Sequence, residues 1–252
     1  MRLRNRVAII TGAGAGIGKA IALRYGAEGA RVVVAEIDGQ TGAATAHEIQ
    51  AGQGEAVFIR TDVAEEKDVR AMVEGTLEHF GRIDILINNA AILLYGKDSR
   101  LHEVSAEVWE RTMAVNLDGH FFCAKYVLPH MLKQGGGCII NLASPTGLRG
   151  YENLTAYSTS KGAIAALTRA MAADYSRYNI RVNALVPGTI DTPMNAVELA
   201  DEKMRQKLMA MTPCGRLGVA DDLAGLAVFL ASDDASYCVG GFYAADGGLM
   251  AI

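Results

Sequence analysis

The stretch VAIITGAGAGIG, residues 7–18, decides the fold because it joins a short apolar run to a glycine-rich turn. Apolar residues then recur at helical spacing from Ile17 to Ala27, so the turn leads from a strand into a helix. The turn fits T-G-x-x-x-G-x-G, whereas G-x-G-x-x-G and the phosphate-binding P-loop need residues that this stretch lacks. Glycines here allow the backbone to approach a pyrophosphate at a helix N-terminus, where free N–H groups favour anions. We therefore expect a strand–turn–helix unit that binds a dinucleotide.

Outward from this unit, short apolar runs alternate with helical patterns along the whole chain. The runs span residues 7–10, 31–35, 56–60, 83–87, 137–142, 180–186 and 242–245. The longest helical pattern, over 105–133, has Ser105 as a candidate N-cap and an interruption near Gly119. This alternation is typical of βαβ units, in which helices cover both faces of a parallel sheet. No break in composition divides the chain, so we predict one α/β domain over residues 1–252, with a doubly wound sheet of about seven strands.

The composition is that of a globular protein, since 50% of the 252 residues are hydrophobic and 21% are charged. A formal net charge of -4 without a basic block argues against nucleic acid or an anionic membrane as a partner. The cysteines form no Cys-x-x-Cys pair, which favours reduced thiols over a zinc site. No run approaches the ~20 apolar residues of a membrane span, and the first apolar run is too short for a signal peptide. We expect a cytoplasmic protein without a metal.

A second informative stretch, SPTGLRGYENLTAYSTSK, runs from Ser144 to Lys161. Within it Tyr157 and Lys161 are four residues apart, so on a helix both side chains would lie on one face. A lysine ammonium favours a phenolate, and we expect it to lower the pKa of Tyr157 from its reference of about 10. A tyrosine with such a pKa can exchange a proton with a carbonyl or an alcohol. Ser144 would direct its hydroxyl at the same oxygen.

Together these motifs resemble the short-chain dehydrogenase/reductase family. The resemblance covers essentially the whole chain and rests on T-G-x-x-x-G-x-G at 11–18, Asn88-Asn89-Ala90, Asn116, Ser144, Tyr157, Lys161 and Pro187-Gly188. One departure is Ala91, where the family usually has glycine after Asn-Asn-Ala; the extra methyl predicts a small shift near the cofactor without loss of function. The resemblance implies a Rossmann fold, oxidoreductase activity and a nicotinamide cofactor.

The resemblance also implies four catalytic residues. Tyr157 would be the general acid/base, and Lys161 would lower its pKa and hold the ribose next to the nicotinamide. Ser144 would hydrogen-bond the substrate oxygen. Asn116 would hold a water that links Lys161 to solvent. In this scheme the protein supplies position and electrostatics, while the cofactor supplies the hydride.

For the cofactor, the resemblance implies contacts from the glycine turn, from the ends of the strands and from the segment that starts at Pro187. Asn89 would contact a ribose, and Thr192 would hold the carboxamide of the nicotinamide. Asp62 and Val63 would contact the adenine, although an acid before a helix also complements the helix dipole. The full set is Gly12, Ala15, Gly16, Ile17, Gly18, Glu36, Ile37, Asp62, Val63, Asn89, Ala90, Ala91, Tyr157, Lys161, Pro187, Gly188, Ile190 and Thr192.

Glu36 ends the second apolar stretch, 18 residues after Gly18, and indicates which nicotinamide cofactor is preferred. An acidic residue about 20 residues beyond the turn accepts a hydrogen bond from the ribose 2′-OH. The same carboxylate would repel a 2′-phosphate, by about 4 kcal/mol at an effective dielectric of 20. Family members that prefer NADP usually carry a basic residue at position 15 or just after position 36, where this chain has Ala15 and Ile37. We therefore expect NAD rather than NADP.

The substrate pocket is expected after the fourth and fifth strands and in the segment over residues 187–217. That segment would be a lid over the substrate or an ordinary surface excursion. Arg149 would hold a carboxylate or a phosphate, although arginine is more often exposed to solvent. The candidate substrate residues are Leu94, Tyr95, Pro145, Thr146, Arg149, Tyr151 and Met194.

These observations favour an NAD-dependent oxidoreductase that moves a hydride between the cofactor and a secondary alcohol or ketone. An alternative is an NADPH-dependent 3-oxoacyl-acyl carrier protein reductase, which shares the catalytic residues but conflicts with Glu36. A more distant alternative is a dinucleotide-binding regulator without turnover, because a fold alone does not establish catalysis. The C-terminal stretch GGFYAADGGLMAI is apolar and resembles family tails that pack into subunit interfaces, which implies a homotetramer. The alternative is that this stretch packs onto the core of its own chain.

Overall fold

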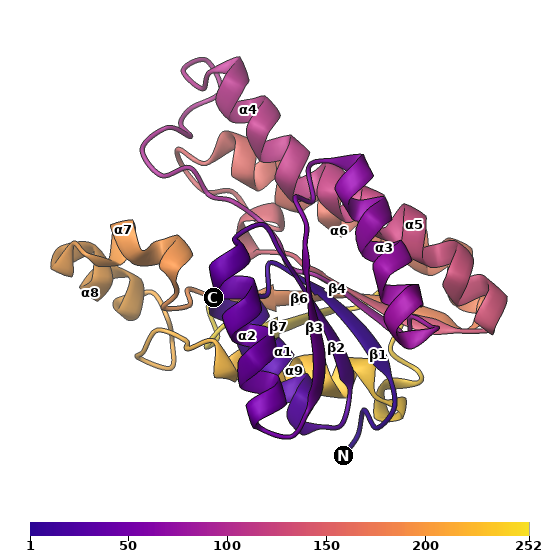
Figure 1. Ribbon diagram of the computed structural model, residues 1–252. Helices are drawn as coiled ribbons and strands as arrows, with labels where there is room; N and C mark the ends of the chain where they lie inside the picture. Colours follow the sequence, from indigo (N-terminus) through magenta and orange to yellow (C-terminus); the bar gives the residue numbers. More distant parts are fainter. Residues whose placement is uncertain (252) are drawn as a thin grey trace.

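The centre of the molecule is a seven-stranded sheet in the order β3-β2-β1-β4-β5-β6-β7 (Figure 1), in a computed structural model that describes residues 1–251. All neighbouring strands are parallel. The strands are β1 Val7–Thr11, β2 Arg31–Glu36, β3 Glu55–Arg60, β4 Ile85–Asn88, β5 Gly137–Leu142, β6 Ile180–Pro187 and β7 Phe242–Ala245. Each lies within about two residues of an apolar run in the sequence, so the predicted α/β fold is confirmed.

Helices cover both faces of this sheet (Figure 1). Ile10 of β1 packs in a core with Ile21 and Leu223. The preceding residue, Ile9, packs with Met72 in a second core on the opposite face of the sheet. Successive residues of a strand point to opposite faces, so a sheet buried on both sides needs continuous apolar runs. The helices are α1 Gly16–Ala27, α2 Gly39–Ala51, α3 Glu66–Phe80, α4 Ala106–Met113, α5 Gly119–Gln134, α6 Thr155–Tyr175 and α9 Asp221–Ala231.

The winding of the chain reverses between β1 and β4, which lie side by side at the middle of the sheet. In an open parallel sheet, such a reversal leaves a crevice outside the carboxyl ends of the strands, where ligands bind. The glycine turn follows β1, and Asn89 and Ala90 follow β4. The topology therefore brings sequence motifs that are far apart along the chain to the same edge.

The long helical pattern over 105–133 is divided at its predicted interruption. α4 ends at Met113, a π-helical turn (η1) covers Ala114–Asp118, and α5 begins at Gly119. The predicted cap is also present, since Ser105 Oγ accepts the backbone N–H of Val108 at 3.2 Å. Single π-helical turns are frequent at functional sites, and this one contains Asn116.

The segment after β6 carries two short helices, α7 Ala196–Leu199 and α8 Glu202–Ala210. They project from one side of the sheet, drawn in orange in Figure 1. Their position beyond the carboxyl end of β6 places them near the crevice rather than on a covered face. Of the helices formed by residues 1–251, none is long and apolar enough to cross a membrane.

Candidate active site

The glycine turn between β1 and α1 forms a tight cradle that leaves no room for a side chain at Gly12 or Gly18. Gly12 and Gly16 have φ angles of 63° and 54°, in the left-handed region that favours glycine. A Cβ on Gly18 would lie 2.2 Å from the carbonyl oxygen of Gly12, so α1 starts in direct contact with the turn. Ala15, the residue before α1, has extended backbone and a methyl side chain that caps nothing. The bare helix N-terminus and the close backbone fit a pyrophosphate group.

Asn89 and Thr11 hold this turn in place. The side-chain amide of Asn89 donates to the carbonyl oxygens of Thr11 and Gly12, at 2.9 and 3.1 Å. The Thr11 hydroxyl oxygen accepts the backbone N–H groups of Asn89 and Ala90, at 3.0 and 3.1 Å. The segment after β4 is therefore tied to the segment after β1. The contact of Asn89 with a ribose stays a prediction, while its bonds to the turn give it a structural role that the sequence did not reveal.

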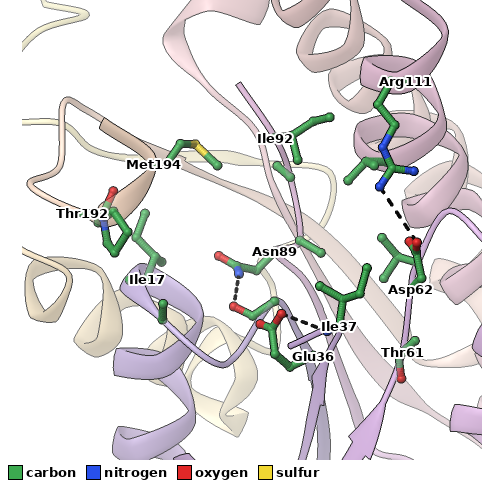
Figure 2. Close-up of a pocket in the computed structure, with 18 residues that line it drawn as sticks. Ile17, Glu36, Ile37, Thr61, Asp62, Asn89, Ile92, Arg111, Thr192 and Met194 are labelled. Carbon is green, nitrogen blue, oxygen red and sulfur yellow. Dashed lines mark hydrogen bonds and ion pairs between the residues drawn. The ribbon is translucent and has the colours of Figure 1, made fainter. Parts of the chain in front are cut away.

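A cavity of about 270 Å³ opens beside the cradle (Figure 2). Thr192 and Met194 lie at one end of it, Glu36 and Asn89 near its middle, and Arg111 at the other end. Its walls include the predicted cofactor residues Gly12, Ala15, Gly16, Ile17, Glu36, Ile37, Asp62, Val63, Asn89, Ala90, Ala91 and Thr192. They also include Thr61, Ile92, Arg111, Val115, Pro193 and Met194. The cavity thus collects most of the predicted cofactor residues from five different strand ends and loops.

The remaining predicted cofactor residues do not line this cavity. Gly18 packs behind the turn, where its neighbours are Gly12 and Asn89. Gly188 and Ile190 border a second cavity, of about 170 Å³, and Ile190 is buried in the core beside α9. Ile190 forms an isolated parallel bridge with Gly218. Pro187, the last residue of β6, Tyr157 and Lys161 also lie outside the walls of the larger cavity.

Glu36 presents to the cavity a carboxylate that backbone N–H groups hold in place. One oxygen accepts from Gly14 at 2.9 Å, and the other accepts from Ile37 and Asp38 at 2.8 and 3.2 Å. A Cβ on Gly14 would lie 2.9 Å from this carboxylate, so a side chain there would push the Glu36 carboxylate aside. These bonds fix a negative charge beside Ile37, at the end of β2.

Asp62 and Arg111 face one another at the end of the cavity, as Figure 2 shows. Their charged groups are 3.9 Å apart, and both side chains are partly exposed. Asp62 also accepts the backbone N–H of Ala64 at 3.0 Å, which holds the turn before α3. Both sequence interpretations of Asp62, as an adenine contact and as an acid that complements the α3 dipole, stay predictions. Arg111 was missed because its position on α4 carries no motif.

Ser144, Tyr157 and Lys161 come together at the carboxyl end of β5. Tyr157 and Lys161 lie on one face of α6, with Lys161 Nζ 5.8 Å from the centre of the Tyr157 ring, as their spacing predicts. Ser144 follows β5 and shares a side-chain hydrogen bond with Tyr157. The ammonium of Lys161 donates to the carbonyl of Leu142, the last residue of β5, at 2.8 Å. This arrangement can hold a carbonyl or hydroxyl oxygen next to a proton donor.

The predicted fall in the pKa of Tyr157 is wrong: the protein atoms around the phenol raise its pKa. Although part of its side chain is accessible, the surrounding protein atoms desolvate the phenol and raise its pKa to about 12; the hydrogen bond with Ser144 opposes the rise. Burial also lowers the pKa of Lys161 to about 8, since the residue is only 2% exposed. The spacing argument considered the attraction between the two groups and overlooked the desolvation of both.

Asn116 bonds to protein groups through both ends of its side-chain amide. Its Oδ1 accepts the backbone N–H of Ile92 at 2.8 Å, and its Nδ2 donates to the Ile92 carbonyl at 3.0 Å and to Ser160 Oγ at 3.1 Å. The side chain therefore joins η1 to a wall of the cavity and to α6, one residue before Lys161. Asn116 Oδ1 keeps a second lone pair, so the predicted water at Asn116 stays a prediction.

Asp98, which the sequence analysis missed, fixes the start of α6. Its two carboxylate oxygens accept the backbone N–H groups of Ala156 and Tyr157, at 3.0 and 2.9 Å. It is 6% exposed, while Leu154, which precedes the helix, offers only an apolar side chain. A carboxylate at a helix N-terminus satisfies free N–H groups and complements the dipole. No local pattern reveals this cap, because it reaches α6 from 58 residues away.

Two predicted substrate residues lie where the segment after β6 meets the segment after β4. The Tyr95 hydroxyl donates to the carboxylate of Glu198 on α7. Burial raises the pKa of Glu198, with an opposing effect from Lys207. Met194 lines the cavity of about 270 Å³. The two segments are therefore connected across the crevice.

The other predicted substrate residues bond mainly to one another. Thr146 Oγ1 donates to Ser144 Oγ at 2.9 Å. Arg149 donates to the Tyr151 hydroxyl oxygen from two nitrogens, at 3.2 and 2.9 Å. Pro145 is buried, and the carbonyl of Leu94 accepts backbone N–H groups of its own turn. Their contact with a substrate stays a prediction.

Known proteins resemble the chain over its whole length. Residues 12–250 match the family model described as enoyl-(acyl carrier protein) reductase. The 2-(R)-hydroxypropyl-CoM dehydrogenase of Xanthobacter autotrophicus is 41% identical over 249 residues, which cover 98% of this chain and 100% of that protein. The 3-oxoacyl-[acyl-carrier-protein] reductase of Thermotoga maritima is 37% identical over 250 residues, which cover 99% and 100%.

Among solved structures, a gluconate 5-dehydrogenase from Burkholderia cenocepacia in complex with NADP and tartrate has a TM-score of 0.94 to this chain. The identity is 36%, and the match covers 100% of this chain and 97% of the other. Sequence and structure comparisons thus agree on the same kind of protein.

Proposed function

Because the chain belongs to the short-chain dehydrogenase/reductase family of oxidoreductases, we propose that it interconverts a secondary alcohol and a ketone with NAD as the hydride carrier. The observation that carries the proposal is the grouping of Ser144, Tyr157 and Lys161 next to the dinucleotide cavity. Asn116 connects these three residues to the cavity, since it bonds both to Ile92 in the cavity wall and to Ser160 beside Lys161.

The cavity has the chemistry that a nicotinamide dinucleotide requires. The cradle of Gly12 and Gly16 admits backbone contact with the pyrophosphate, and a Cβ on Gly16 would reach within 3.4 Å of Thr192. Glu36 would accept the 2′-OH of the adenosine ribose, and Lys161 would hold the ribose hydroxyls of the other half. When bound, the nicotinamide supplies or accepts the hydride.

Tyr157 would exchange the proton at the substrate oxygen. During alcohol oxidation, the hydroxyl proton moves to the Tyr157 oxygen while the hydride leaves the carbinol carbon; during ketone reduction, Tyr157 returns a proton to the carbonyl oxygen. A pKa of about 12 keeps the phenol protonated at neutral pH, which suits reduction. Oxidation needs the phenolate, so its rate should rise with pH. Ser144, bonded to Tyr157, would orient the same oxygen.

Glu36 supports NAD as the preferred cofactor. Its carboxylate is fixed by three backbone N–H groups and therefore has little freedom to move away from a 2′-phosphate. The gluconate 5-dehydrogenase relative was solved with NADP, which speaks for the phosphorylated dinucleotide. The repulsion, about 4 kcal/mol at an effective dielectric of 20, should outweigh this analogy.

The first experiment follows absorbance of the reduced nicotinamide with a panel of secondary alcohols, polyols, sugars and hydroxy acids, each with NAD and with NADP. We expect turnover with NAD. Tyr157→Phe should lose nearly all turnover and keep its dinucleotide affinity. A Tyr157→Phe variant that turns over like the wild type would refute the assigned role, and a wild type that binds NAD tightly without any turnover would favour the regulator.

Glu36→Gln tests the choice of cofactor, because it keeps the shape of the side chain and removes its charge. The ratio of kcat/KM for NAD to that for NADP should fall roughly a thousandfold. Glu78→Gln, an exposed position on α3, is the matched control and should leave the ratio unchanged. If Glu36→Gln also leaves it unchanged, Glu36 does not select the cofactor.

A second candidate function is the NADPH-dependent reduction of a 3-oxoacyl group carried on a thioester. The 37% identity to the Thermotoga maritima reductase favours it, and it needs the same Ser144, Tyr157 and Lys161. Turnover restricted to NADPH and a 3-oxoacyl thioester would place it first. Turnover with NAD on simple secondary alcohols would exclude it as the main activity.

We also propose that the chain assembles as a homotetramer. β7 forms an edge of the sheet, whose unpaired backbone groups can pair with another chain, and Phe121 on α5 is 46% exposed; both are candidate subunit contacts. Light scattering should give four times the 26.7 kDa of one chain. A particle with the mass of one chain would contradict this assembly.

A further inference from the structure

Arg111 has no part in the proposed hydride transfer, yet it lies in the dinucleotide cavity. It belongs to α4 and lies at the end of the cavity that is opposite Thr192 (Figure 2). Among the wall residues that the structure describes, it is the only lysine or arginine. Its guanidinium is 3.9 Å from the carboxylate of Asp62, and 48% of its side chain is exposed. The cavity therefore ends at a planar cation with accessible surface.

The flat faces of this guanidinium are available to a ligand. Within residues 1–251, Arg111 pairs only with Asp62, and no aromatic ring lies against it. An arginine side chain presents a rigid plane that stacks on aromatic faces, in addition to its charge. A partly exposed ion pair at this distance adds little to stability, so substitution of Arg111 should leave the fold intact.

The order of the groups along the cavity indicates which part of the dinucleotide reaches Arg111. Thr192 lies at one end, Glu36 near the middle and Arg111 at the other end (Figure 2). In the proposed function, on which this inference rests, the glycine turn takes the pyrophosphate and Glu36 takes the ribose of the adenosine half. The group beyond that ribose, on the side away from Thr192, is the adenine. Arg111 is the charged residue at that end that the proposed function leaves without a ligand group.

Apolar side chains in the same cavity suit the faces of an aromatic base. Ile37 lines the cavity and is 44% exposed although it is apolar. Val63, the residue after Asp62, and Val115, four residues after Arg111, are also in the wall. An adenine presents two apolar π-faces, and an arginine cation is attracted to such a face when it lies within about 6 Å of the ring centre. A base between these side chains would cover apolar surface on one face and meet the guanidinium on the other.

We propose that the Arg111 guanidinium stacks on the adenine of the bound dinucleotide and that Asp62 holds the guanidinium in that position. Stacking depends on the plane as well as on the charge, whereas an ion pair with Asp62 depends on the charge alone. Lysine has the charge without the plane, so the two roles can be separated by substitution. Arg111 would thus contribute to the affinity for the adenine half without contacting the reacting atoms.

Both tests use ADP-ribose, which carries the adenine and the pyrophosphate but no nicotinamide, so neither test needs turnover. A crystal structure of the wild-type complex should show Cζ of Arg111 within about 6 Å of the centre of the adenine ring. An adenine bound elsewhere, or an Arg111 side chain turned away from the ring, would overturn the proposal.

The second test measures the Kd of ADP-ribose by titration calorimetry. It should rise about 3- to 30-fold in Arg111→Gln, which removes the cation from the ring face. Arg111→Lys keeps a charge opposite Asp62 but lacks the plane, so it should recover only part of the affinity. Arg24→Gln is the matched control and should bind like the wild type, because Arg24 is 50% exposed and pairs with Glu28 at 3.6 Å on α1, outside the cavity wall.

The outcomes separate this inference from the proposed function. An Arg111→Gln protein that binds ADP-ribose like the wild type would refute the stacking. Full recovery in Arg111→Lys would refute it too, since charge alone would then explain the affinity. If the wild type does not bind ADP-ribose, the dinucleotide site of the proposed function fails, and the inference fails with it. If binding depends on Arg111 as expected but no substrate is turned over, only the proposed hydride transfer is refuted.

Discussion

Replacing Gly18 by alanine should damage the dinucleotide site more than any other single methyl in the glycine turn. The added Cβ would lie 2.2 Å from the Gly12 carbonyl oxygen and 2.5 Å from the Asn89 amide nitrogen. Non-bonded heavy atoms settle at roughly 3.5 Å, so α1 or the turn would have to move by about 1 Å. Overpacking of this kind costs about 1–3 kcal/mol, and the moving parts are those that would hold the pyrophosphate.

The dissociation constant of NADH, measured by its fluorescence, should therefore rise roughly 5- to 150-fold in Gly18→Ala. Thermal unfolding should show a lower Tm at the same time. Gly39→Ala is the matched control: it lies in the first turn of α2, and its Cβ would meet nothing within 4 Å. That variant should bind NADH like the wild type. A Gly18→Ala protein that also binds within twofold of the wild type would refute the assignment of this turn as the cofactor cradle.

Three further predictions concern the residues around the substrate. Asp98→Asn replaces one acceptor oxygen by a donor, so we expect the free energy of unfolding in urea to fall by about 1.5–3 kcal/mol and kcat to fall with it; unchanged values of both would rule out the cap. Lys161→Met should abolish turnover yet raise the free energy of unfolding at pH 7, because it removes a buried ammonium. The pKa of Lys161 is about 8 in the folded protein and 10.5 in a free lysine. Between pH 8 and pH 10.5 the unfolded state therefore binds more protons, so the free energy of unfolding of the wild type should rise with pH over this range. The Lys161→Met variant should lack this rise. Glu198→Gln weakens the bond to Tyr95, so KM for the substrate should rise severalfold at an unchanged Tm, whereas an unchanged KM would show that the two segments close independently of this contact.

Local patterns were sufficient to predict most of the fold. The apolar runs gave all the strands of the sheet because both of its faces are buried, as Ile9 and Ile10 show by packing in opposite cores. Ser105 marked the start of α4 because a serine cap acts within its own turn. The π-helical nature of the turn around Asn116 was not predictable, since it depends on bonds to Ile92 and Ser160 in other parts of the chain.

The candidate site likewise combines residues that local sequence patterns predict with residues that they do not. The glycine turn and Glu36 carry strong local signals, and the structure places them around one cavity. Arg111 and Asp98 carry none, because each acts on a segment that is distant in the sequence. The alternation of βαβ units suggested a crevice, but only the strand order shows which loops line it.

What the sequence by itself determined is the set of local units: the strand, glycine turn and helix at 7–18, and Tyr157 with Lys161 on one helix face. These follow from periodicity and from the freedom of glycine, both of which act over a few residues. Only the tertiary structure decided the pKa values at the site, because the burial that raises the pKa of Tyr157 and lowers that of Lys161 comes from atoms of many segments. Desolvation depends on the whole surroundings of a group, and no spacing along the chain encodes it.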